Sequence, residues 1–233
     1  MSLTQSVKVW DFPTRLFHWT LVLLTIAAFV TGFEGGNLID CHGKIGVALV
    51  GLVSFRLVWG FIGSTYARFL QFIPGPKRIL AYLRGQWHGM GHNPLGAFSV
   101  LGLLALMIFQ LGSGLITDDS ISFTGPLKDL VSQDTSDLFT GLHKQNIWLI
   151  IGLVSLHVAS IVFYAVVKKN NLLLPMITGK KEVDDPVALP ARGGGWRAFI
   201  VAVAIAAGVT WVASGGLIPP PPPPPVQTAP AAW

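Results

Sequence analysis

The chain has 233 residues, of which 52% are hydrophobic and only 12% are charged. Soluble domains carry about 25% charged residues, so this composition and a mean hydropathy of +0.60 argue against a soluble protein and indicate a membrane protein. The formal charge of +5 is spread over several short loops, which argues against a nucleic-acid partner. The single cysteine excludes an intramolecular disulfide, and there is no C-x-x-C-H motif for covalent haem attachment.

Five apolar segments recur along the chain. Each is about as long as the roughly 20 residues that cross a bilayer as a helix, although the last is shorter. None alternates apolar and polar residues as the strands of a membrane barrel do, so each is expected to be a transmembrane helix. The segments are residues 16–33, 45–63, 95–116, 147–167 and 198–213. The predicted fold class is therefore an all-α membrane protein.

The loops between these segments predict the orientation, because Lys and Arg in short loops mark the cytoplasmic side. The segment before the first helix and the loops at 64–94 and 168–195 are rich in Lys and Arg. The loop at 117–142 has five Asp against one Lys. This alternation predicts a multi-pass protein of the bacterial inner membrane, with a cytoplasmic N-terminus and a periplasmic C-terminus.

The sequence also predicts the structure or location of four segments outside the apolar runs. GPKRILAYLRG (75–85) is basic and amphipathic and is expected on the inner membrane surface. LKDLVSQDTSDLF (127–139) could form a short acidic helix, in a loop that is either simply solvated or a docking surface for a basic partner. ARGGGWR (191–197) is expected to be a flexible joint. The seven prolines at 219–225 would extend about 22 Å as polyproline II and are either a stiff spacer or disordered.

Histidines in or next to the apolar segments are the candidate functional residues, because ionisable groups inside a membrane are costly and usually functional. His143 and His157 lie fourteen positions apart on the fourth helix, which places them on one face and about 21 Å apart along the axis. His42 starts the second helix at the outer end, and His18 lies in the first turns of the first helix on the inner side. The spacing predicts an outer pair, His42 with His143, and an inner pair, His18 with His157, less well matched in depth unless a helix tilts.

Such pairs on facing helices are how haem b is held. A histidine in a membrane helix can also serve only as a hydrogen-bonding group between helices, which is a weaker explanation for four histidines at matched depths. A zinc site is disfavoured, because no carboxylate or thiolate cluster completes either pair. The third helix contains no histidine and is expected to contribute packing and no ligand.

Arg15 and Arg56 are candidate partners for the anionic propionates of a haem. Either could instead extend its charge to the membrane surface. His92, just before the third helix, is either interfacial or a contact for a haem propionate or a quinone headgroup. His88, in the same loop, is expected to be solvated.

Five motifs together resemble the prokaryotic cytochrome b561 family, which includes the b-type cytochrome subunit of nickel–iron hydrogenases. They are VWDFPTRLFHW (9–19), FRLVWGFIGSTYARF (55–69), GHNPLG (91–96), the H-x13-H of the fourth helix and KKNNLLLPMITGKK (168–181). The resemblance covers roughly residues 7–181 and implies a four-helix core with two haems b, each bound by two histidines. Carried onto this sequence, the axial iron ligands are His18, His42, His143 and His157, in the pairs reached from topology.

The expected organisation adds elements to that core. Residues 1–181 would form a cytochrome b561-like di-haem domain and residues 182–195 a flexible joint. Residues 196–214 would form an additional transmembrane helix and residues 215–233 a proline-rich periplasmic tail. The usual core of the family lacks the last two.

The resemblance implies electron transfer across the inner membrane, between ubiquinone or menaquinone and a periplasmic redox protein such as a c-type cytochrome or a hydrogenase. An electron-transfer subunit is expected in preference to a stand-alone enzyme. One alternative is a superoxide oxidase that passes electrons to quinone, which the acidic outer loops disfavour because an anion needs a basic entrance. The other is a membrane anchor without redox function.

Overall fold

The computed structural model describes residues 5–87, 89–183 and 188–219. In these residues five helices are long and apolar enough to cross a membrane. They are α1 (Phe12–Glu34), α2 (Ile39–Ile62), α5 (Pro94–Gly114), α6 (Gln133–Val166) and α8 (Trp196–Ala213). Each overlaps one predicted apolar segment, so the predicted helical membrane fold is confirmed.

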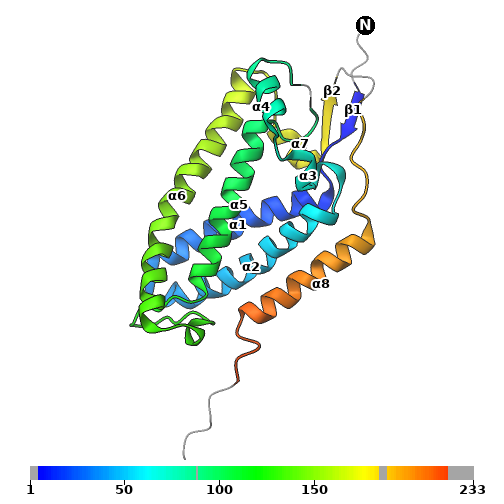
Figure 1. Ribbon diagram of the computed structural model, residues 1–233. Coiled ribbons are helices and arrows are strands. Elements are labelled where there is room, and N and C mark those ends of the chain that lie inside the picture. Colours follow the sequence, from blue (N-terminus) through cyan, green and yellow to red (C-terminus); the bar gives the residue numbers. More distant parts are fainter. Residues whose placement is uncertain (1–4, 88, 184–187, 220–233) are drawn as a thin grey trace, which may run out of the picture.

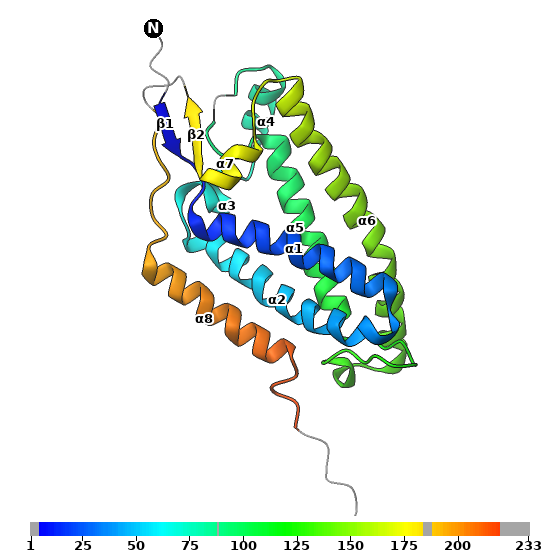
Figure 2. The same cartoon turned by 180° about the vertical axis from the view of Figure 1, so that it is seen from behind.

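Four of the long helices form two pairs, and the fifth, α8, packs against one of them. α1 lies beside α2, and α5 lies beside α6, while α2 also contacts α5 and carries α8 along its other side. Figures 1 and 2 show the two pairs close together at the end with residues 115–132 and spread apart at the opposite end. The elements at that opposite end are the short helices α3 (Phe69–Phe72), α4 (Pro76–Leu83) and α7 (Leu173–Thr178) and the strands β1 (Gln5–Lys8) and β2 (Lys180–Val183).

The buried side chains form a core that joins the pairs. Leu49 and Val53 of α2 pack with Met107 and Leu111 of α5 and with Ile150 of α6. A second cluster lies between α2 and α8, where aromatic rings of α2 meet small residues of α8. Its members include Phe55, Trp59, Ala202 and Ala206.

A two-stranded sheet was not predicted from the sequence. β1 and β2 pair antiparallel, with Gln5 opposite Val183 and Lys8 opposite Lys180. The backbone N–H groups of Val9 and Trp10 both donate to the carbonyl oxygen of Gly179, at 2.8 and 3.1 Å. The sheet therefore ties the start of α1 to the chain that follows α7.

Side-chain caps fix where two membrane helices begin. Asp11 accepts a hydrogen bond from the backbone N–H of Thr14 at 2.7 Å, and its second oxygen accepts one from Nε1 of Trp59 at 3.0 Å. Asn93 caps α5 in the same way, accepting from the N–H of Gly96 at 2.7 Å. The buried carboxylate of Asp11 thus joins the start of α1 to the C-terminal end of α2.

The fourth membrane helix begins well before its apolar run. α6 begins at Gln133, ten residues before His143, with Ser132 as its cap. In the acidic segment 127–139, Lys128–Leu130 forms a 3-10 turn and the residues from Gln133 onward belong to α6, so the separate acidic helix is absent among these described residues. The extension was missed because its residues are polar and carry no apolar period.

Residues near the expected joint are hydrogen-bonded to the rest of the fold. The N–H of Ala191 donates to the carbonyl of Lys8 at 2.7 Å, and the N–H of Thr65 donates to that of Arg192 at 2.8 Å. Residues 184–187 of the joint and the proline run beyond Pro219 lie outside the described residues. The division of the chain at residues 181 and 195 stays a prediction.

Candidate functional site

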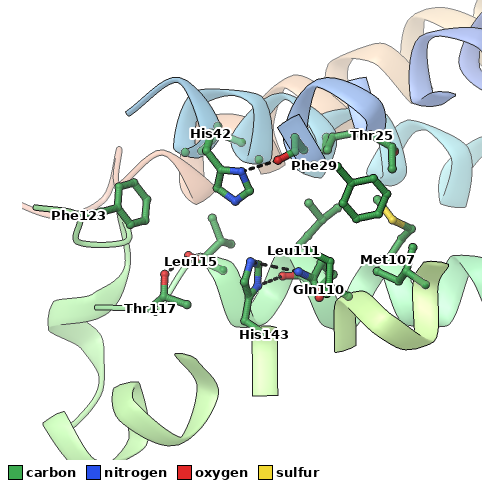
Figure 3. Close-up of a pocket in the computed structure, with 18 of the residues that line it drawn as sticks. Thr25, Phe29, His42, Met107, Gln110, Leu111, Leu115, Thr117, Phe123 and His143 are labelled. Carbon is green, nitrogen blue, oxygen red and sulfur yellow. Dashed lines mark hydrogen bonds between the residues drawn. The ribbon is translucent and has the colours of Figure 1, made fainter. Parts of the chain in front are cut away.

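The outer pair of histidines comes together. His42 of α2 and His143 of α6 face each other across a pocket, with ring centroids 6.2 Å apart and ring planes at 90° (Figure 3). Two imidazoles on opposite sides of one metal ion have centroids about 6.3 Å apart, because each metal–nitrogen bond is about 2 Å long. The surrounding pocket is mostly apolar. Its lining includes Thr25, Phe29, Met107, Leu111, Leu115 and Ile150.

Both outer rings are oriented through Nδ1. Nδ1 of His42 lies 2.9 Å from the carbonyl oxygen of Ala28. Nδ1 of His143 lies 2.9 Å from that of Gln110. A carbonyl oxygen only accepts hydrogen bonds, so each Nδ1 carries the proton and each Nε2 keeps its lone pair. This is the form in which a neutral imidazole binds a metal.

An amide network supports the same tautomer of His143. Nε2 of Gln110 donates to Nε2 of His143 at 3.1 Å. Asn146, which is buried, donates from Nδ2 to Oε1 of Gln110 at 2.9 Å and to the carbonyl of Leu106 at 3.1 Å. Because the Gln110 amide lies against the nitrogen that would bind a metal, this side chain must move when Nε2 becomes a ligand.

Two glycines let the rings lie against neighbouring helices. A Cβ atom on Gly32 would lie 2.8 Å from Cε1 of His42, and one on Gly114 would lie 2.9 Å from Cε1 of His143. Contacts this short do not occur between a real Cβ and its neighbours. Residues 32 and 114 therefore have to be glycine for the rings to keep these positions.

The inner histidines also share one neighbourhood. His18 of α1 and His157 of α6 are within electrostatic range of each other. Oγ of Ser99 lies 3.4 Å from Nδ1 of His157. Nδ1 of His18 is buried and has no hydrogen-bond partner among the described residues. Buried polar atoms without partners are rare, so this atom indicates a place for a group that the chain itself does not supply.

His92 joins this inner group. Its ring lies between Trp10 and Phe72, with centroid distances of 4.8 and 4.7 Å. Burial, and then the charges of Arg56, His157 and His18, lower the pKa of His92 to about 3, so its imidazole is neutral at physiological pH. Its Nδ1 is buried and without a partner in the described part of the chain. His88 lies outside the described residues.

The two arginines differ in what they contact. Nη1 of Arg15 donates to the carbonyl of Ile177 and so caps the last turn of α7, where Nε1 of Trp19 also donates to the carbonyl of Met176 at 3.1 Å. Arg56 is only 3% exposed, and its guanidinium lies 4.9 Å from the ring centroid of Phe69. Its Nη1 has no hydrogen-bond partner within the described residues. The buried carboxylate of Asp11 is a nearby counter-charge for Arg56, and Nε of Arg15 is also buried without a partner in the described part of the chain, so both arginines have a donor atom left for an anionic group.

These residues fit haem b. The outer pair offers two lone-pair nitrogens from facing helices, at the separation that one metal ion needs, in an apolar pocket. The inner group offers two further imidazoles and an arginine nitrogen without a partner. Sequence reasoning missed Gln110, Asn146 and Ser99 as parts of these sites. They carried one signal, namely that they stand in or beside apolar runs.

Comparison with known proteins adds an independent result. The sequence model of a family described as prokaryotic cytochrome b561 matches residues 9–179. The "Probable Ni/Fe-hydrogenase B-type cytochrome subunit" of Azotobacter chroococcum mcd 1 is 26% identical over 237 residues, which covers 83% of this chain and 89% of that protein. The "Probable Ni/Fe-hydrogenase 1 B-type cytochrome subunit" of Escherichia coli (strain K12) is 21% identical over 214 residues, covering 75% and 90%. No solved structure matches the chain.

The region matched by the family contains α1 to α7 and all four candidate ligand histidines, whereas α8 lies beyond it. A b-type cytochrome binds haem b without covalent attachment, which agrees with the histidine pairs and with the absence of a C-x-x-C-H motif from the sequence. The chain therefore belongs to the prokaryotic cytochrome b561 family and is a membrane-bound b-type cytochrome that transfers electrons.

Proposed function

We propose that the protein carries electrons across a bacterial inner membrane through two haems b. His42 and His143 would hold one near the outer surface, and His18 and His157 the other near the inner surface. The observation that carries this proposal is the outer pair, in which two perpendicular imidazoles 6.2 Å apart are both held by Nδ1 with Nε2 turned to the pocket. Lys and Arg in the loops support a cytoplasmic N-terminus.

Haem b supplies a one-electron iron couple when it is bound. The chain's own part is to bind, orient and separate the two centres. Two imidazoles would hold the haem at each site, and the chemistry that it would supply there is electron transfer. α6 carries one ligand of each pair, so its helical rise sets their separation along the axis at about 21 Å.

On the outer side, the proposed partner is a hydrogenase. The relatives in Azotobacter chroococcum and Escherichia coli are named as b-type cytochrome subunits of Ni/Fe-hydrogenases. A c-type cytochrome is the alternative redox partner. Residues 115–131, which would face this partner, are held to the start of α6. Oγ of Ser136 donates to the carbonyl of Ile116 at 2.7 Å, and the N–H of Asp118 donates to Oγ1 of Thr140 at 3.1 Å.

On the inner side, the proposed partner is ubiquinone or menaquinone. A pocket beside His92 combines aromatic and polar groups, and the free Nδ1 of His92 can hydrogen-bond a quinone oxygen. His92 is also within electrostatic range of both inner ligands, so a quinone bound there would be close to the inner haem. The lining includes Tyr66, Gln71, Phe72, Arg78, Trp87 and His92.

Spectroscopy of the purified protein tests the haem assignment. A reduced-minus-oxidised spectrum should show b-type bands, with two haems per chain. His143→Ala should remove the outer haem and retain the inner one, and His18→Ala should do the reverse. Ser155→Ala, at an exposed position of α6, serves as the control and should retain both haems. A colourless wild-type protein would favour the alternative of a membrane anchor without redox function. A His143→Ala protein that keeps both haems would refute the assignment of His143 as a haem ligand.

Quinol oxidation tests the inner pocket. In liposomes that contain menaquinol or ubiquinol, His92→Ala should slow haem reduction by the quinol about tenfold, because one hydrogen bond to the headgroup is lost. Lys77→Ala, an exposed change on α4 outside the pocket lining, should leave the rate unchanged. Equal rates of haem reduction in His92→Ala and the wild type would show that the quinone does not bind beside His92.

A further inference from the structure

The two outer ligand histidines are held by matched sets of three positions on two different helices. In each set, a carbonyl at position i and a hydroxyl at i+3 both face Nδ1, and a glycine at i+4 lies under the ring. Positions i, i+3 and i+4 share one face of a helix. We call each set a ligand cradle. The cradles are Ala28, Thr31 and Gly32 on α1, for His42, and Gln110, Ser113 and Gly114 on α5, for His143.

In the α5 cradle, the hydroxyl of Ser113 is a close second acceptor for His143. Its Oγ lies 3.1 Å from Nδ1 of His143, beside the carbonyl of Gln110 at 2.9 Å. The hydroxyl proton is already used, because Oγ donates to the same carbonyl at 3.0 Å. A lone pair of Oγ is therefore left to accept from the Nδ1–H group.

The α1 cradle repeats this arrangement at a longer distance. Oγ1 of Thr31 lies 3.5 Å from Nδ1 of His42, beside the carbonyl of Ala28 at 2.9 Å. Its hydroxyl proton is directed to the carbonyl of Ala27 at 2.8 Å. Thr31 and Ser113 are both buried, so water does not compete for these hydroxyls.

Acceptors on Nδ1–H change the ligand strength of the imidazole. They draw the proton away from Nδ1 and increase the electron density on Nε2, which makes the ring a stronger donor to a metal. A stronger donor stabilises the higher oxidation state of iron and so lowers its reduction potential. Ser and Thr in membrane helices often donate a hydrogen bond to a carbonyl of their own helix without affecting any ligand. The hydrogen bonds from Thr31 and Ser113 to their own helices therefore do not by themselves assign these residues a role at the histidines.

We propose that Ser113 and Thr31 are positioning residues that act through His143 and His42 to lower the reduction potential of the outer haem. This inference rests on the proposed ligation of that haem by His42 and His143. Two cradles with the same spacing, on helices that share no other ligand motif, support it. The shorter distance gives Ser113 the larger effect.

Potentiometric titration of the purified holoprotein tests this proposal. Ser113→Ala and Thr31→Val remove only the hydroxyl, and Thr31→Val keeps the side-chain volume. Each should raise the midpoint potential of the outer haem, with the reduction equilibrium shifted on the order of fivefold for Ser113→Ala and less for Thr31→Val. Ser113→Thr and Thr31→Ser, which keep the hydroxyl, should restore the wild-type potential.

The test includes a matched control, and its outcomes separate failure of the tuning proposal from failure of the proposed function. Ser155→Ala, at an exposed position of α6, should leave both potentials unchanged. Wild-type potentials for both Ser113→Ala and Thr31→Val, with two haems retained, overturn the tuning role and leave the haem assignment standing. If Ser113→Ala does not keep its haem, Thr31→Val decides by the same criterion. Wild-type protein without haem b, or a His143→Ala protein that keeps both haems, defeats the proposed function itself.

Discussion

At the scale of single residues, the glycines beneath the outer rings carry the sharpest steric constraint. Gly114→Ala would place a methyl group 2.9 Å from His143, so the ring has to turn away from the pocket. We expect the haem content to fall from about two to about one per chain, which a haem assay against protein concentration measures. Gly112→Ala is the control, because a Cβ there meets nothing within 4 Å. Full haem content in Gly114→Ala would show that the ring tolerates displacement.

The perpendicular rings of His42 and His143 predict a spectroscopic signature. At 90° the two imidazoles interact with different d orbitals of an iron between them, which leaves those orbitals close in energy. The oxidised outer haem should therefore give a strongly anisotropic low-spin electron paramagnetic resonance signal. That signal should vanish in His143→Ala. A rhombic signal typical of parallel rings would contradict the geometry.

Single residues also show where sequence reasoning stops. His18, His42, His143 and His157 stood out because an imidazole in an apolar run has few structural explanations. Ser113 did not stand out, since small residues are common where membrane helices pack. Its role depends on which histidine lies opposite, and that is decided only when α5 packs against α6.

At the scale of elements, α5 contributes more than the packing predicted for it. It has no histidine, yet its hydroxyls face a histidine of α6 at each site: Ser113 lies 3.1 Å from His143, and Ser99 lies 3.4 Å from His157. The two serines are fourteen residues apart, as are the two histidines. α5 therefore contacts both α6 histidines through its serines.

This arrangement predicts separable effects along α5. Ser99→Ala should raise the midpoint potential of the inner haem by about 20 mV, the size expected for one weak hydrogen bond, and leave the outer haem unchanged. Redox titration of the two haems, assigned with His18→Ala and His143→Ala, measures the shift. An equal change at both haems would indicate a general rearrangement of α5.

Elements that form only by pairing with a distant part of the chain could not be predicted from the sequence. β1 and β2 have only four residues each, without apolar alternation, and lie about 170 positions apart. The N-terminal extension of α6 was hidden for a related reason, because hydropathy indicates the membrane-spanning part of a helix and not where the helix begins. The amphipathic character of residues 75–85, by contrast, was recognised from local sequence, and α4 lies within this segment at Pro76–Leu83. Its location at the inner membrane surface stays a prediction.

At the scale of the whole molecule, α8 is an addition outside the region matched by the family. It packs on α2 through Ala202, which is 0% exposed, close to Phe55 and Trp59. No described residue of α8 lines the pocket between His42 and His143. The added helix is therefore placed to stabilise α2 without supplying a ligand.

Substitution in α8 should separate stability from haem binding. Ala202→Leu overfills a closed contact and should lower the free energy of unfolding by about 1–3 kcal/mol while both haems stay bound. Ala204→Leu, on an exposed face of the same helix, should have little effect. Thermal denaturation followed by haem absorbance compares them. Loss of a haem from folded Ala202→Leu protein would instead link α8 to ligation.

The order and number of membrane helices followed from hydropathy alone, whereas the divergence of the two helix pairs did not. α6 crosses this divergence as one continuous helix of 34 residues, and it bears a histidine for each site. The spacing between His143 and His157 is therefore set by the number of residues in this one helix. Inserting one residue between positions 143 and 157 would rotate one ring by about 100° relative to the other. The length of that interval is consequently as tightly constrained as the identity of the residues at its two ends.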